Sequence, residues 1–121
     1  MTTLARGTSG PLTFLEGPAG QPLFQSADDV TTLLEQCFAV PTRAALLYAA
    51  NLPPAFFDVS SQQAGTFLQE LRHYGLRVAL VAPADSVPMS QRFHELLAAE
   101  RRDRAFGIFD SRAAALAWLT E

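Results

Sequence analysis

The chain has 121 residues, of which 49% are hydrophobic and 17% are charged, and its formal net charge is −3. This length predicts a single domain, and the hydrophobic content excludes general disorder. The weak negative charge gives no reason to expect a nucleic acid as the main partner.

The start of the chain predicts an irregular leader and then a hairpin. Residues 1–11 are mostly small or polar and form the expected flexible leader, so the single α/β domain is expected to span residues 12–121. Leu12 to Glu16 and Pro22 to Gln25 are typical of short strands, and the Gly-Pro-Ala-Gly turn between them favours a hairpin-like reversal.

The next segment predicts a helix that begins after Ser26 and ends before Pro41. Its apolar residues recur at the helical spacing and predict one buried stripe, consisting of Val30, Leu33, Leu34, Cys37 and Phe38. Because Cys37 lies on this stripe, we interpret it as a small buried hydrophobe rather than a reactive thiol.

Strands and helices then alternate. Ala44 to Ala50 is an uninterrupted apolar run, which is typical of a strand covered on both faces. A helix is predicted from about Gln62 to Tyr74, with Gly75 as its left-handed C-terminal cap. Its expected buried residues are Ala64, Phe67, Leu68 and Leu71. Leu76 to Ala82 is the next predicted buried strand.

The last third of the chain repeats this alternation. A helix is predicted to begin at Ser90, and Ala105 to Phe109 is predicted to form a strand. Asp110 or Ser111 caps the last predicted helix, whose expected inward residues are Ala113, Leu116 and Ala117, with Trp118 and Leu119 widening the stripe. The order β-β-α-β-α-β-α-β-α predicts an α/β fold: a mostly parallel sheet of four to five strands, covered by about four helices.

No pattern in the sequence is typical of catalysis or metal binding. His94-Glu95 begins like a zinc-binding helix motif, but Ala98 stands where the second histidine is required. His73 is predicted to lie on the solvent side of its helix. Nucleophile-elbow, dinucleotide and phosphate-loop signatures are missing as well. We therefore expect neither an enzyme, nor a metal site, nor a cofactor.

The candidate binding site is a rim at the carboxyl end of the predicted sheet, where ligands and partners of open α/β sheets collect. Two predicted loops open on this rim, and the residues that we expect to line it are Asn51, Phe56, Phe57, Asp58, Ser60, Ser61, Asp85 and Ser86. An exposed pair of phenylalanines would make an apolar anchor of the kind that protein interfaces favour.

Two features of the chain allow a structural and a functional interpretation. Ser60 and Ser61 precede a predicted helix, so one of them is its N-cap residue, or either is a phosphoacceptor stabilised by the helix dipole. The charged run Glu100 to Arg104 is a solvated helix end or a site for an acidic partner. We favour the structural interpretation of both.

Several segments resemble a small bacterial family known as domain-of-unknown-function family 4180. These are Phe56-Phe57-Asp58, Ala64-Gly65, Leu68-Gln69, Tyr74 with the apolar strand Val78 to Val81, and the closing Ala-x-x-Trp-Leu at residues 115–119. More distantly, the element order and the strand–Phe-x-Asp–helix loop resemble STAS domains, the fold of anti-sigma factor antagonists. That resemblance implies a regulatory or binding module.

Together these features predict a non-enzymatic regulatory or protein-interaction domain. The alternative is a domain that binds a small molecule or anion at the N-terminus of the second helix, with a minor enzymatic activity as one form of it. We expect a protein partner, with a homodimer as a further possibility, and no membrane or nucleic-acid partner. The single cysteine and the lack of a targeting or membrane segment predict a cytoplasmic location.

Overall fold

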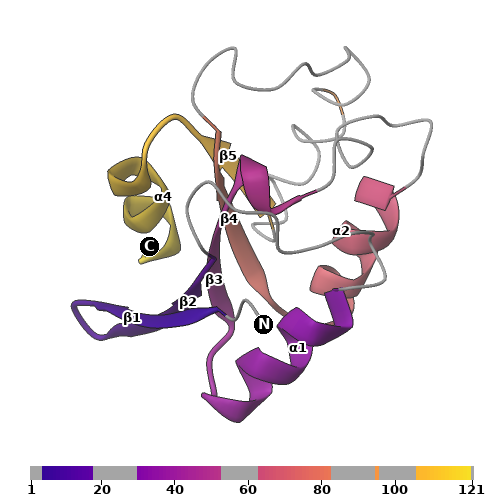
Figure 1. Cartoon of the computed structure of the whole chain (residues 1–121), viewed down its shortest axis with the longest axis horizontal. Coiled ribbons are helices and arrows are strands. Elements are labelled where there is room, and N and C mark those ends of the chain that lie inside the picture. The colour runs from indigo at the N-terminus through magenta and orange to yellow at the C-terminus, as the bar shows by residue number, and fades with distance from the viewer. Residues whose placement is uncertain (1–3, 18–29, 53–62, 83–94, 96–105, 121) are drawn as a thin grey trace.

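The computed structural model describes residues 4–17, 30–52, 63–82, 95 and 106–120. In this part of the chain, a five-stranded sheet separates α1 and α2 on one face from α4 on the other (Figure 1). The predicted α/β class is confirmed. The expected helix that begins at Ser90 lies outside the described residues, apart from Glu95, as do the expected strand Pro22 to Gln25 and the expected cap Ser26.

The strands follow one another across the sheet in the order of the sequence, β1-β2-β3-β4-β5. Their bounds are Ala5–Ser9, Leu12–Glu16, Ala44–Tyr48, Arg77–Val81 and Phe106–Phe109. β1 is antiparallel to β2, whereas β2, β3, β4 and β5 run parallel to one another. The sheet is therefore mostly parallel, as the alternation of strands and helices predicted.

The first strand corrects the prediction for the leader. Ala5–Ser9 forms β1 and pairs with Leu12–Glu16 along its whole length, so this part of the leader is an edge strand. β1 consists mostly of small and polar residues and therefore has no apolar pattern that would predict a strand. It is extended because it pairs with β2. Gly10, with φ of 59°, makes the tight turn between the two strands.

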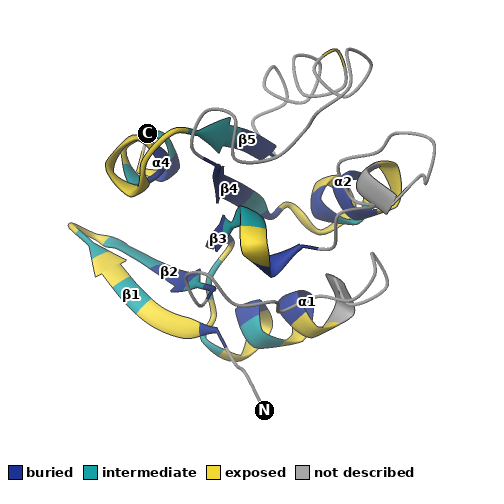
Figure 2. Ribbon diagram, turned by 45° about the horizontal axis from the view of Figure 1, so that its top comes forward, coloured by how far each residue is buried: buried dark blue, intermediate teal, exposed yellow. Residues whose placement is uncertain are grey.

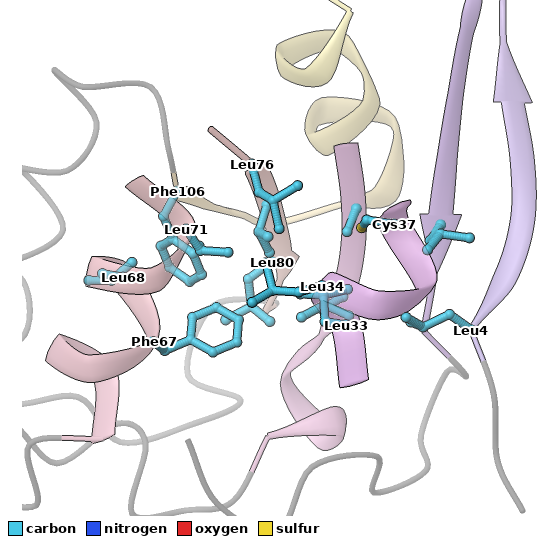
Figure 3. Close-up of a cluster of buried hydrophobic side chains, with 14 of the residues drawn as sticks. Leu4, Leu33, Leu34, Cys37, Phe67, Leu68, Leu71, Leu76, Leu80 and Phe106 are labelled. Carbon is cyan, nitrogen blue, oxygen red and sulfur yellow. The ribbon is translucent and has the colours of Figure 1, made fainter. Parts of the chain in front are cut away.

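The larger core lies between the sheet and the helices α1 (Val30–Ala39) and α2 (Gln63–Tyr74). Its buried residues include Leu33, Leu34 and Cys37 of α1 and Phe67, Leu68 and Leu71 of α2, which meet over β3 and β4 (Figure 3). These side chains confirm most of both predicted stripes.

Phe38 departs from the predicted stripe of α1, because its side chain is 55% exposed. It follows the fully buried Cys37 at the end of the helix and lies at the margin of the arc that faces the sheet. Helical spacing alone does not show where the sheet stops covering a helix.

The smaller core lies between the other face of the sheet and α4 (Arg112–Leu119). Ser111 caps this helix by accepting a hydrogen bond from the Ala114 amide at 3.2 Å, as predicted. The predicted inward residues Leu116, Trp118 and Leu119 pack against this core. Ala113 and Ala117, also predicted inward, are exposed, and Ala115 is buried instead. Four alanines provide too little contrast in hydrophobicity to set the rotation of so short a helix.

Burial is deepest in the middle of the sheet. Alternate residues of β3 face the two cores: Ala45 and Leu47 face α1 and α2, and Ala44 and Leu46 face α4. Figure 2 shows β3 and β4 almost wholly buried, and β1 largely exposed at the edge. The uninterrupted apolar runs in the sequence thus mark the strands that are covered on both faces.

Arg77 and Gly75 stabilise the C-terminal ends of two helices, α4 and α2. The Arg77 guanidinium donates to the main-chain oxygens of Trp118 and Leu119, at 2.9 and 3.3 Å, and lies 4.4 Å from the centre of the Trp118 ring. It thereby satisfies carbonyls at the negative end of α4. Gly75 ends α2 with φ of 70°, which confirms the predicted left-handed cap.

The two glycines of the α2 segment should respond oppositely to the same substitution. Gly75→Ala is expected to lower the free energy of unfolding by about 1 kcal/mol, because a side chain is strained at positive φ. Gly65→Ala should raise it by about 0.5–1 kcal/mol, since Gly65 is in a helix and a Cβ there meets no atom within 4 Å. Urea unfolding measures both, and equal signs would contradict these conformations.

Candidate functional site

The carboxyl ends of β3 and β4 lie side by side, because the parallel register pairs Tyr48 with Val81. The chain segments that carry the predicted rim residues follow these two strand ends. Of these residues, the structure describes only Asn51. The other members of the predicted rim lie outside the described residues: Phe56, Phe57, Asp58, Ser60, Ser61, Asp85 and Ser86.

Asn51 is at the expected edge of the sheet, but its side chain is completely buried. It closes the short 3-10 turn Ala49–Asn51, where its Oδ1 accepts a hydrogen bond of 2.7 Å from the Tyr48 amide. The carboxamide packs against Gly17, at the end of β2, so tightly that a Cβ on residue 17 would collide with it. Asn51 thus holds the turn after β3 against the end of β2 from inside.

A polar cluster of Glu16, Tyr48 and Arg112 lies at the same edge. The Tyr48 hydroxyl donates a hydrogen bond of 2.5 Å to Glu16 Oε2, and the Arg112 guanidinium binds both carboxylate oxygens, at 3.0 and 3.1 Å. Glu16 ends β2, Tyr48 ends β3 and Arg112 begins α4, so the cluster joins three elements that are distant in sequence. Two-point contact to a carboxylate is the geometry that arginine favours.

The packing of the β1–β2 hairpin determines the position of this cluster. Phe14 and Glu16 point to the same face of β2, two residues apart. The buried Phe14 ring lies across Gly7 of β1, where a Cβ would come within 2.7 Å of the ring. The Arg112 guanidinium lies 5.9 Å from the centre of the Phe14 ring. A glycine in the edge strand therefore makes room for the aromatic ring beneath the start of α4.

The contacts within the cluster shift the pKa values of Glu16 and Tyr48 in opposite directions. The hydrogen bond from Arg112 is the main cause that lowers the pKa of Glu16; burial opposes it and the bond from Tyr48 adds to it. Burial raises the pKa of Tyr48, and donation to the Glu16 carboxylate raises it further. Glu16 is therefore ionised and Tyr48 protonated near neutral pH. This arrangement joins β2, β3 and α4 at one edge of the sheet.

The sequence does not predict this cluster, because its members come from two strands and a helix that are distant in the chain. The available signal was weak: Glu16 and Tyr48 each end a predicted strand, and polar residues at the ends of adjacent strands meet at one edge of a sheet. The partner Arg112 follows a predicted cap residue and has no feature in the sequence that connects it with residue 16.

Outside this edge, two single-residue predictions are confirmed. Cys37 is buried, and burial raises the pKa of its thiol to about 11, so it is protonated at neutral pH. His73 is exposed on α2, as expected. In the described part of the chain, no group of three or more His, Cys, Asp or Glu side chains is placed to hold a metal ion. His94 and the charged run from Glu100 to Arg104 are not among the described residues.

The chain is thus an α/β domain whose strands lie in sequence order across the sheet. Contacts of Glu16 with Tyr48 and Arg112 join β2, β3 and α4 at the carboxyl edge of this sheet. Residues 11–119 match the family described as Domain of unknown function (DUF4180), and the chain belongs to this family. No curated protein and no solved structure matches the chain significantly. None of the helices described is long and apolar enough to cross a membrane.

The Glu16 carboxylate should make stability depend on pH. Glu16→Gln is expected to lower the free energy of unfolding by about 1 kcal/mol at pH 7, because the bonds to Arg112 and Tyr48 lose their charge. The folded-state pKa of Glu16 is lowered, so its contribution is present above the unfolded-state pKa. It is lost as the pH falls through the folded-state pKa.

Urea unfolding between pH 7 and pH 2 tests this, with Glu95→Gln, which alters an exposed carboxyl group, as the control. The difference between the wild type and Glu16→Gln should disappear in acid. A difference that persists in acid, or an equal loss in Glu95→Gln, would show that the charge of Glu16 is not responsible.

The contact between Gly17 and Asn51 should appear as coupling between the two positions. Gly17→Ala is expected to destabilise the fold by about 1–3 kcal/mol, because the new methyl group collides with the Asn51 carboxamide. Asn51→Ala leaves the Tyr48 amide without its acceptor and should cost about 1–3 kcal/mol. The double variant should lose less than the sum, because Asn51→Ala removes the collision. Additive losses in urea unfolding would contradict this packing.

Proposed function

We propose that this protein is a cytoplasmic, non-catalytic regulatory module that binds a protein partner at the carboxyl edge of its sheet. The observation that supports this most directly is the register of β3 and β4, which brings the ends of both strands to one edge. The two segments that contain the predicted rim residues begin there. In open α/β sheets, ligands bind outside the carboxyl ends of the strands.

The described residues at this edge form a rigid base rather than a reactive centre. Asn51 is buried and accepts from the Tyr48 amide, so the turn after β3 is held from within. Glu16 is engaged by both Tyr48 and Arg112, which ties β2, β3 and α4 together. These contacts fix the strand end and the turn from which the segment after β3 continues.

The chemistry of the predicted rim fits a protein partner better than a small ligand. Phe56 and Phe57 provide the aromatic anchors in which interfaces are enriched, and Asp58 adds a charge that selects the partner. At the described edge, the guanidinium of Arg112 is already bound to Glu16 through both oxygens. That pairing disfavours Arg112 as the receptor for an anion.

The distant resemblance to STAS domains belongs to this proposal and rests on an analogy of fold. The described elements follow the order β-β-α-β-α-β and, beyond the gap that ends at residue 105, β-α. A regulatory phosphate on Ser60 or Ser61 would fit such a module, since a helix N-terminus stabilises negative charge.

Quantitative affinity capture from native cell extract tests the proposal, with the wild type, Phe56→Ala, Asp58→Ala and a control variant, Gln69→Ala. Gln69 is an exposed residue of α2 and is not one of the predicted rim residues. We expect a partner whose recovery falls at least about tenfold with Phe56→Ala and is unchanged with Gln69→Ala. Equal recovery of every protein by all four forms would refute the rim as the binding surface.

The same preparation discriminates the alternative of a small-molecule or anion-binding domain. Phosphate or another small anion should then raise the melting temperature of the isolated protein in proportion to its concentration. Intact-mass measurement and phosphosite mapping of protein from its native cell would show whether Ser60 or Ser61 is modified.

A further inference from the structure

A second surface lies where α1 and α2 end. Phe38 and Tyr74 are the two large hydrophobic side chains that stand out as exposed in the described part of the chain, at 55% and 41%. They contact each other, with ring centres 5.8 Å apart, and the His73 ring packs edge-on against Tyr74 at 4.7 Å. Side chains from two helices thus form one aromatic patch on the surface.

The charges around the patch are segregated. Glu35 precedes Phe38 by three residues on α1, and Glu70 precedes Tyr74 by four on α2, so a carboxylate stands one turn before each ring. Arg43 lies beyond the ends of both helices, and its guanidinium comes within 3.7 Å of the Cβ position of Gly75. Arg72, also exposed, lies in the last turn of α2. The carboxylates therefore lie toward the helix N-termini, and the guanidinium groups lie at the last turn of α2 and beyond the helix C-termini.

We propose that this patch binds a second copy of the same chain, in a homodimer with two-fold symmetry. A two-fold axis through the aromatic pair sets Phe38 against the partner's aromatic residues and places Glu35 of one copy opposite Arg43 of the other. Within the described part of the chain, neither Glu35 nor Arg43 forms an ion pair of its own. Both charges are thus available for pairing across the axis.

The arrangement of charges favours a second copy over other occupants. A uniformly acidic or uniformly basic ligand would be repelled by one side of the patch. A copy of the chain related by a two-fold axis carries the opposite charge at both sides at once. An interface between identical surfaces must be self-complementary, and this patch meets that requirement. We therefore identify the partner as a second copy of the chain.

The dimer is independent of the proposed function. α1 and α2 end close to the starts of β3 and β4, whereas the proposed partner-binding rim follows the other ends of these strands. Two copies joined through the patch would therefore meet near the opposite ends of β3 and β4 from their carboxyl ends. Failure of either proposal does not affect the other.

Sedimentation velocity over a range of concentrations tests the dimer. The wild type should show a reversible monomer–dimer equilibrium, and Phe38→Ser should raise its dissociation constant at least about tenfold, as expected for loss of a central aromatic anchor. Thr32→Ser, at another exposed position of α1, should leave it unchanged. Since Phe38 is exposed, circular dichroism should show Phe38→Ser folded like the wild type.

A charge reversal tests the orientation. Glu35→Arg and Arg43→Glu should each be monomeric alone, because like charges then face each other twice across the axis. An equimolar mixture should form the heterodimer, since both contacts become pairs of opposite charge. A wild type that stays monomeric up to about 1 mM, a Phe38→Ser variant that dimerises normally, or a mixture that stays monomeric would overturn the proposal.

Discussion

The burial of β3 and β4 on both faces is the constraint from which the rest of the structure follows. Alternate residues of each strand must find an apolar cover, so one face requires α1 and α2 and the other requires α4. Parallel strands joined by helices then place all their carboxyl ends at one edge. The edge at which we propose the binding site is therefore set by the parallel arrangement of these strands.

The two faces of the sheet are held in different ways. The larger core is closed mainly by leucines and by the Phe67–Phe106 pair, whose ring centres lie 6.3 Å apart. α4 is only eight residues long, and polar contacts hold it at both ends: Arg112 with Glu16 at the start, and Arg77 with the last carbonyls. A short helix with few buried side chains gains a defined position from such directional contacts.

The sequence predicted the features that depend on local pattern. The apolar runs of β3 and β4, the stripe of α2 and the cap at Gly75 all follow from the period or the conformation of neighbouring residues. β1 was missed, because an edge strand of small and polar residues is ordered by its partner strand. In α4, Leu116, Trp118 and Leu119 pack inward as predicted, whereas Ala113 and Ala117 are exposed, since alanine differs little between buried and exposed positions.

At the candidate site, the sequence by itself determined the edge of the sheet, because parallel strands must end together. Only the tertiary structure decided that Asn51 is buried beneath that edge, that Glu16 is shared between Tyr48 and Arg112, and that Phe38 lies outside the core beside Tyr74. The contacts between Glu16 and its partners and between Phe38 and Tyr74 join residues at least 32 positions apart in the chain. The burial of Asn51 and the exposure of Phe38 depend on how far the neighbouring elements cover these side chains. Periodicity along a chain contains no information on either.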